Sequence, residues 1–171
     1  MRSVSVMLII FFSFVINAPE ALATDTAPAL GQYAPPFELT DLSGKTIRLS
    51  EYKGRVVLLH FWSTLCAPCT TELPSLSRLA DLFRSAELAV LTVSIDASDK
   101  QVKDFMAAHA IGFTVLRDGD KEVFFDQYAG PILPASYLID RNGIIVQIVA
   151  GSREWDAPGM QEEILKLLKK R

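Results

Sequence analysis

Cysteine and histidine are scarce in this sequence, and neither sign of charge dominates. The 171 residues include two cysteines, two histidines, 17 basic residues and 20 acidic residues, for a formal net charge of −3. Such mild acidity, with basic residues clustered only at the C-terminus (residues 166–171), is not typical of a nucleic-acid-binding protein. The apolar run over residues 4–16 is shorter than the roughly 20 residues that cross a bilayer as a helix.

The N-terminal segment has the organisation of a secretory signal peptide. Arg2 precedes the apolar run, and Ala21-Leu22-Ala23 supplies small residues before a cleavage point. We expect residues 1–23 to be removed, residues 24–34 to form a flexible lead, and residues 35–171 to fold as one domain. An uncleaved N-terminal anchor is the alternative. Both interpretations place the folded part outside the cytoplasm, in the periplasm or an equivalent compartment.

The two cysteines stand close together at a position that favours redox chemistry. Cys66-Ala67-Pro68-Cys69 lies between an apolar strand, residues 56–62, and an amphipathic helix, residues 70–84. A structural disulfide is common in exported proteins, but this spacing closes only a very small loop and would constrain the unfolded chain little. A helix N-terminus favours a thiolate through its unpaired N–H groups and its dipole. The spacing therefore predicts a reactive dithiol.

Hydrophobic periodicity predicts alternating strands and helices around this motif. The expected elements are a hairpin (37–40 and 46–49), a central strand (56–62), a helix (70–84), a strand (88–95), a helix (99–110), a strand (113–117), a brief helix (123–128), a second hairpin (135–139 and 144–150) and a final helix (156–170). The first long helix places Leu73, Leu76, Ala80 and Phe83 on its apolar face and Glu72, Ser75, Arg78 and Asp81 off it. Asp156 is the expected N-cap of the last helix. This order predicts an α/β domain with a mixed sheet covered by helices on both faces.

Two motifs resemble the thioredoxin fold. The sequence Phe61-Trp62-Ser63-Thr64-Leu65-Cys66-Ala67-Pro68-Cys69 is followed by Pro74, and Leu133-Pro134-Ala135-Ser136-Tyr137-Leu138-Ile139-Asp140 comes later. With the signal peptide, the N-terminal hairpin, the central insertion near residues 99–117 and a glutamate three residues after Cys69, the chain resembles the TlpA/ResA-type extracytoplasmic thiol–disulfide oxidoreductases. The similarity extends from about residue 35 to residue 170.

The resemblance implies a role for each residue of the motifs. Cys66 would be the attacking nucleophile, Cys69 the resolving thiol, and Glu72 the acid that helps to move the Cys69 proton. Pro134 would be a cis-proline facing the dithiol, with Pro131 as the competing candidate. The implied substrate-binding residues are Trp62, Ala67, Pro68, Leu133 and Pro134. A first-turn glutamate that only complements the helix dipole is the alternative for Glu72.

Two positions differ from the pattern of this family. Leu65 stands directly before Cys66, where thioredoxins often have tryptophan, which changes the rim of the substrate surface. His60 stands on the central strand, where thioredoxin has a buried acid. We expect a neutral, hydrogen-bonded core histidine there, although a protonatable imidazole could tune the dithiol. His109 is expected at the surface.

The expected activity is reduction of disulfides in exported proteins. Proline before Cys69 and the absence of histidine between the cysteines favour a reductant. The resemblance implies a membrane electron donor of the DsbD/CcdA type, substrates in cytochrome c maturation or copper-site assembly, a monomer, and neither cofactor nor metal. A thiol peroxidase using Ser63, or a metal-binding module using Cys66, Cys69, His60 and His109, are the alternatives.

Overall fold

The structure is a computed structural model that describes residues 27–84, 88–109 and 111–170. The expected signal peptide and the first three residues of the expected flexible lead, 24–26, lie outside the described residues. The rest of the lead is described, and backbone hydrogen bonds join Gly31 and Gln32 to Ile145 at the start of β7. Within the described part, no helix is both long and apolar enough to cross a membrane. The proposed boundaries of the lead and the domain stay predictions.

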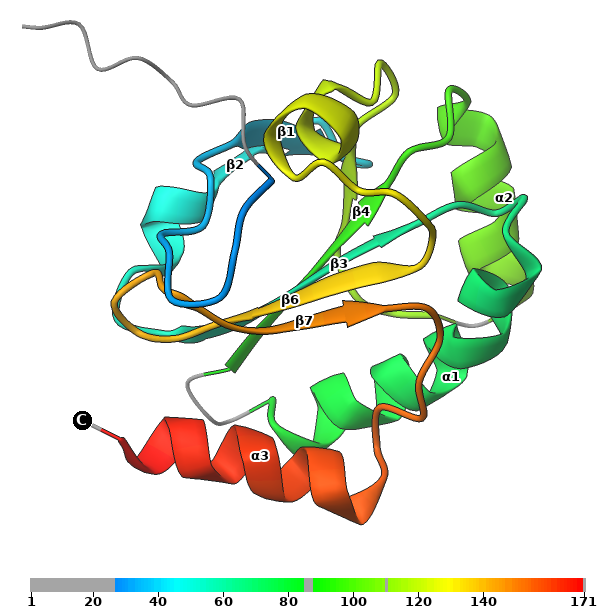
Figure 1. Cartoon of the computed structure of the whole chain (residues 1–171). Coiled ribbons are helices and arrows are strands. Elements are labelled where there is room, and N and C mark those ends of the chain that lie inside the picture. Colours follow the sequence, from blue (N-terminus) through cyan, green and yellow to red (C-terminus); the bar gives the residue numbers. More distant parts are fainter. Residues whose placement is uncertain (1–26, 85–87, 110, 171) are drawn as a thin grey trace, which may run out of the picture.

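Seven strands form one mixed sheet in the order β2-β1-β5-β4-β3-β6-β7 (Figure 1). The strands are β1 (Glu38–Asp41), β2 (Thr46–Arg48), β3 (Val56–Trp62), β4 (Leu88–Ser94), β5 (Val115–Arg117), β6 (Ala135–Ile139) and β7 (Ile145–Ala150). β3, β4 and β5 are parallel, whereas β6 runs antiparallel to β3 and to β7. All seven residues of β3 are buried, as its continuous apolar sequence predicts for a central strand.

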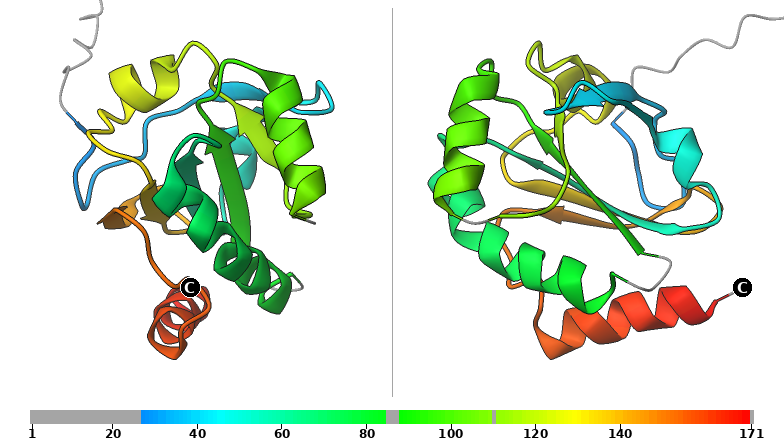
Figure 2. Two further views of the ribbon diagram at one scale, coloured as in Figure 1. Left: turned by 90° about the vertical axis from the view of Figure 1, so that its right-hand side faces the viewer. Right: turned by 180° about the vertical axis from the view of Figure 1, so that it is seen from behind.

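The helices are α1 (Ala67–Leu82), α2 (Asp99–Ala108), α3 (Pro158–Lys169) and the short η1 (Leu49–Tyr52) and η2 (Val123–Gln127). Alternation along β3 divides the core in two, because Val57, Leu59 and Phe61 belong to one cluster and Val56, Leu58 and Trp62 to the other. The three α-helices pack in the second cluster, and α1 and α3 lie along the same side of the sheet (Figures 1 and 2). The opposite face is covered by η1, η2 and the segment before β1. The predicted mixed sheet with helices on both faces is confirmed, although α1, α2 and α3 all lie on one face and only the short η1 and η2 lie on the other.

Two local predictions are wrong. Glu72 and Ser75 were expected off the apolar face of the first helix, but both are buried, because the loop between β7 and α3 folds over them and supplies hydrogen-bond partners. Asp156 does not cap α3, whose N-cap is Ala157. Its carboxylate instead pairs with Arg78 of α1 at 2.5 Å, which ties the start of α3 to α1.

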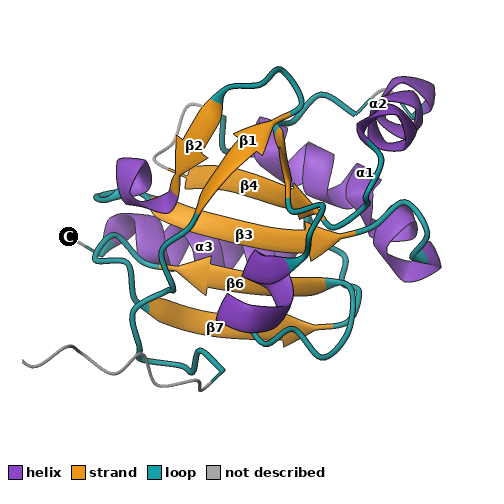
Figure 3. Cartoon of the chain, turned by 90° about the horizontal axis from the view of Figure 1, so that it is seen from above, coloured by secondary structure: helices purple, strands orange, loops and turns teal. Residues whose placement is uncertain are grey.

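The pairing of β3 with β6 places two distant loops at one end of the sheet (Figure 3). Phe61, near the end of β3, is opposite Ala135, the first residue of β6. The segment after β3 leads to Cys66, and the segment before β6 contains Pro134. The antiparallel register therefore brings the dithiol loop and the proline loop to the same edge.

Candidate active site

A buried carboxylate holds the loop that joins β3 to α1. Asp96, just after β4, is 5% exposed and accepts hydrogen bonds of 2.8–2.9 Å from the hydroxyls of Ser63, Thr64 and Ser94 and from the backbone N–H of Thr64. These bonds restrain the backbone two and three residues before Cys66. Sequence reasoning missed Asp96, because its partners Ser63 and Thr64 lie more than 30 residues away and no local pattern links them to it.

The cysteine pair occupies the first turn of α1. Cys66 is the N-cap, and its sulfur accepts the backbone N–H of Cys69 at 3.3 Å. The two sulfurs form a disulfide, with the Cα atoms 5.2 Å apart. Cys66 is partly exposed, whereas Cys69 is completely buried. Because first-turn N–H groups and the helix dipole both stabilise negative charge, reduction of this bond would favour a thiolate on the accessible sulfur, Cys66.

The loop before β6 contains a cis peptide bond between Leu133 and Pro134, and the bond before Pro131 is not cis. This agrees with the assignment that the resemblance implied. Pro134 is buried and its carbonyl accepts the N–H of Gly151 at 2.8 Å, which anchors the loop to the end of β7. Leu133 is half-buried, and Ile132 before it is 50% exposed.

The residues expected to form the substrate surface are not all accessible. Ala67 and Pro68 are exposed, and Leu65 beside them is 83% exposed. Trp62 is completely buried and packs against Phe105 of α2, with ring centroids 5.7 Å apart. The expectation that Trp62 contacts substrate is therefore wrong, because the last residue of a central strand points into the helix-side core. The accessible apolar surface comes from Leu65 and the Ile132 loop instead.

Glu72 lies one turn after Cys69, on the same buried face of α1. Its carboxylate oxygen Oε2 accepts the backbone N–H of Arg153 at 2.7 Å and the indole N–H of Trp155 at 3.0 Å. Burial raises the pKa of Glu72 to about 7, and these two hydrogen bonds only partly oppose that effect. A carboxyl with such a pKa can accept and release a proton near neutral pH.

His60 lies in the centre of β3 and is fully buried, as expected for a core histidine. Its Nδ1 is 2.8 Å from the hydroxyl of Ser136 on β6. Burial lowers the pKa of His60 to about 3, so the ring is neutral near neutral pH. Its other nitrogen, Nε2, lies 3.5 Å from Oε1 of Glu72. The fold thus joins two residues that no local sequence pattern links.

The alternative chemistries find less support in this geometry. The Ser63 hydroxyl, which a peroxide site would need, is bonded to Asp96 and also accepts the N–H of Leu65 at 3.1 Å. The four potential metal ligands do not come together, since His109 is exposed and stacks on Phe105 at the end of α2. Over the described ranges, no three His, Cys, Asp or Glu side chains are grouped to hold a metal ion.

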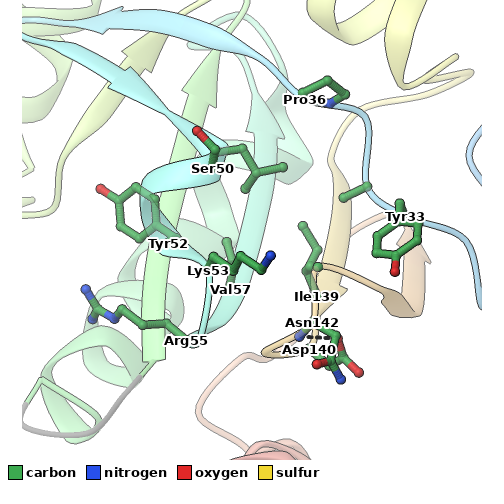
Figure 4. Close-up of a pocket in the computed structure, with 13 residues that line it drawn as sticks. Tyr33, Pro36, Ser50, Tyr52, Lys53, Arg55, Val57, Ile139, Asp140 and Asn142 are labelled. Atoms are coloured by element: carbon green, nitrogen blue, oxygen red, sulfur yellow. Dashed lines mark hydrogen bonds between the residues drawn. The ribbon is translucent and has the colours of Figure 1, made fainter.

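A separate pocket of about 240 Å³ lies at the other end of β3 (Figure 4). Val57 and Ile139, which face each other across β3 and β6, form part of its wall, and Tyr33 and Tyr52 stand on either side. Its lining is mainly apolar and contains neither cysteine nor histidine. The pocket therefore lies apart from the Cys66–Cys69 dithiol.

Comparison with known proteins agrees with this geometry. The AhpC/TSA family model matches residues 30–148. Thiol-disulfide oxidoreductase ResA of Geobacillus kaustophilus is 37% identical over 127 residues, which cover 74% of this chain and 72% of that protein. ResA of Bacillus subtilis is 37% identical over 122 residues, covering 71% and 68%. A solved structure from Chlorobium tepidum, described as thiol:disulfide interchange protein DsbE, has a TM-score of 0.76 and 30% identity over 83% of this chain and 99% of that one.

Proposed function

Because the chain belongs to the AhpC/TSA family and is a thioredoxin-fold thiol–disulfide oxidoreductase of the ResA type, we propose that it reduces disulfides of exported proteins. One observation carries this proposal. An accessible sulfur at a helix N-cap, Cys66, stands before a buried sulfur, Cys69, and a buried carboxyl, Glu72, whose pKa is about 7. The three groups needed for a complete exchange cycle therefore lie at intervals of three residues, from the N-cap into the second turn of one helix.

The proposed cycle has two steps. The Cys66 thiolate attacks one sulfur of a substrate disulfide, which forms a mixed disulfide and releases the other substrate sulfur as a thiolate. Glu72 takes the proton of Cys69, and the Cys69 thiolate attacks the Cys66 sulfur. The second substrate sulfur leaves, and the enzyme carries the Cys66–Cys69 disulfide. The substrate gains two electrons and the enzyme loses two, so the dithiol itself is the redox centre.

The surface beside the dithiol supports a protein substrate with apolar residues near its disulfide. Leu65, Ala67 and Pro68 on one loop and Ile132 on the other are exposed around Cys66. Leu133, half-buried before the cis bond to Pro134, is placed to present its backbone to an extended substrate segment. These residues, without Trp62, form the proposed substrate-binding surface.

The direction of electron flow and the partners belong to the same proposal. Dithiols of this fold range from about −270 mV in thioredoxin to about −120 mV in DsbA, and proline before the second cysteine favours the reducing end. We place the protein outside the cytoplasm as a monomer that is re-reduced by a membrane donor of the DsbD/CcdA type. Its proposed substrates are oxidised cysteines in apocytochrome c or in copper-site proteins.

The test is to trap substrates with Cys69→Ala in the native cell envelope. This variant lacks the resolving thiol, so substrates should remain attached to Cys66 as mixed disulfides, and Cys66→Ala is the matched control that should capture none. Equilibration with glutathione should also give a potential closer to −270 mV than to −120 mV. A potential near that of DsbA, or recovery of the same proteins with Cys66→Ala, would refute the proposal.

A further inference from the structure

Two buried polar atoms face each other without a hydrogen-bond partner. Among the described residues, His60 Nε2 and Glu72 Oε1 are both buried and unpaired, and they lie 3.5 Å apart. The side chains are 0% and 3% exposed. Unpaired polar atoms are costly in a core, and this separation is only about 0.5 Å longer than a good N–H···O bond. A small rotation of the Glu72 carboxyl would form the bond.

The partners of Glu72 show which of its oxygens can carry the proton. Oε2 accepts two N–H groups, from Arg153 and Trp155, and neither donor can accept a proton in return. A proton on Oε2 would therefore point at a donor. The proton must reside on Oε1, which is the oxygen that faces His60.

The partner of His60 shows which tautomer its ring adopts. In the part of the chain that the structure describes, the Ser136 hydroxyl has one hydrogen-bond partner, His60 Nδ1, at 2.8 Å. If this hydroxyl donates to Nδ1, its hydrogen is satisfied and the ring proton lies on Nε2. If Nδ1 were protonated instead, the hydroxyl hydrogen would lack an acceptor and a bare Nε2 would face carboxylate lone pairs. With Glu72 in its carboxylate form, counting donors and acceptors thus selects the Nε2–H tautomer.

The remaining surroundings of Glu72 contain few charged groups. Cys69 and Ser75 flank it on α1, His60 faces it from β3, and Arg153 and Trp155 contact it from the loop before α3. The Arg153 contact is through the backbone N–H, whereas its guanidinium lies 3.9 Å from Glu163. Among the described residues, His60 is therefore the side chain placed to donate a hydrogen bond to Oε1, the unpaired oxygen of Glu72.

We propose that His60 is a positioning residue for proton transfer. Its Nε2–H, oriented by Ser136, binds Oε1 of Glu72 and fixes Oε1 as the oxygen that exchanges a proton with Cys69. The same hydrogen bond keeps the carboxylate form of Glu72 available at neutral pH. This inference rests on the proposed role of Glu72. A protonated Oε1 can still accept Nε2–H through its second lone pair, so its own hydrogen is left to move to and from the Cys69 sulfur. No redox step is added, because the proton that Cys69 loses is the one that Oε1 gains.

The test separates the two steps of the cycle. Reduced protein reacts with 5,5′-dithiobis(2-nitrobenzoate), and release of nitrothiobenzoate is followed by stopped flow. The first equivalent reports attack by Cys66, and the second reports attack by Cys69 on the mixed disulfide. We expect His60→Leu to move the pH midpoint of the second phase upward by about 1 unit, because a carboxylate loses a donor. The first phase should not change.

Three variants complete the design. His60→Gln carries an amide N–H about as far from the backbone as Nε2 and should restore the midpoint to that of the wild type. Thr92→Val is the matched control, because Thr92 is the buried β4 neighbour of His60 and its hydroxyl bonds the Thr114 carbonyl instead of Glu72. It should leave the midpoint unchanged. Glu72→Gln should remove the pH dependence of the second phase.

Each outcome is decisive. If Glu72→Gln removes the pH dependence but His60→Leu leaves the midpoint in place, His60 has no positioning role and the role of Glu72 stands. If Glu72→Gln has no effect, the proposed base itself is wrong. The tautomer of His60 can also be measured in the wild-type protein, so the test does not depend on the folding of any variant. Long-range ¹H–¹⁵N spectra should show His60 protonated on Nε2, and protonation on Nδ1 would overturn the inference.

Discussion

Two variants of the His60–Glu72 pair, Glu72→Gln and His60→Leu, should each make the free energy of unfolding depend on pH, and in opposite directions. Glu72 has a pKa of about 7 in the folded state against an ordinary value of 4.5. Its stabilising contribution to the free energy of unfolding is therefore fully present below pH 4.5 and is lost as pH rises towards 7. His60 has a folded pKa of about 3 against 6.5, so its contribution is present above pH 6.5 and is lost as pH falls. Between pH 4.5 and 6.5 the two effects cancel in the wild type.

The magnitude follows from the same values. Over these two pH units, each group changes the free energy of unfolding by about 2 kcal/mol, at about 1.4 kcal/mol per unit of full proton uptake. Relative to the wild type, Glu72→Gln should lose about 2 kcal/mol between pH 6.5 and pH 4.5, because only the His60 effect remains. His60→Leu should lose a similar amount between pH 4.5 and pH 6.5, because only the Glu72 effect remains.

The assay is urea denaturation at constant ionic strength, with the Cys66–Cys69 disulfide intact in both states. Taking the difference in free energy of unfolding between each variant and the wild type at each pH cancels the contribution of the surface carboxyls that all the proteins share. Glu162→Gln, which removes an exposed carboxyl from α3, is the matched control and should run parallel to the wild type. Parallel curves for Glu72→Gln and the wild type, or slopes of the same sign for the two core variants, would refute the reasoning.

Three further predictions concern the reaction. Cys69→Ala should eliminate the second phase of nitrothiobenzoate release and leave the first intact; a residual second phase would show that another thiol resolves the mixed disulfide. Leu65→Ser should lower kcat/KM about fivefold for a peptide disulfide flanked by apolar residues, because about 1 kcal/mol of apolar contact is lost. The same variant should not affect the reaction with 5,5′-dithiobis(2-nitrobenzoate), and an equal loss with the peptide and with this reagent would argue against a substrate contact by Leu65. Asp96→Ala should lower the free energy of unfolding by about 2–4 kcal/mol, since buried hydroxyls lose their acceptor, and should slow the first phase; unchanged attack by Cys66 would show that the loop needs no such restraint.

Much of the fold is local in origin and could be read from periodicity. The apolar run of β3, the two hairpins and the amphipathic helices each carry their signal within a few residues. The predicted start of the last helix at Asp156 differs from the observed start of α3 at Pro158, because Asp156 binds Arg78 of α1 instead of capping the helix. A capping residue can be recognised locally, but a competing partner 78 residues away cannot.

The candidate site divides in the same way. The sequence alone determined that two cysteines stand at a strand-to-helix junction, because strand, dithiol and helix are contiguous. Tertiary structure decided which neighbours those groups have. The loop before α3 buries Glu72 and raises its pKa, the β3 register removes Trp62 from the surface, and sheet-to-helix packing brings His60 to the free oxygen of Glu72. Burial and the approach of chain-distant polar atoms depend on packing, which no short stretch of sequence encodes by itself.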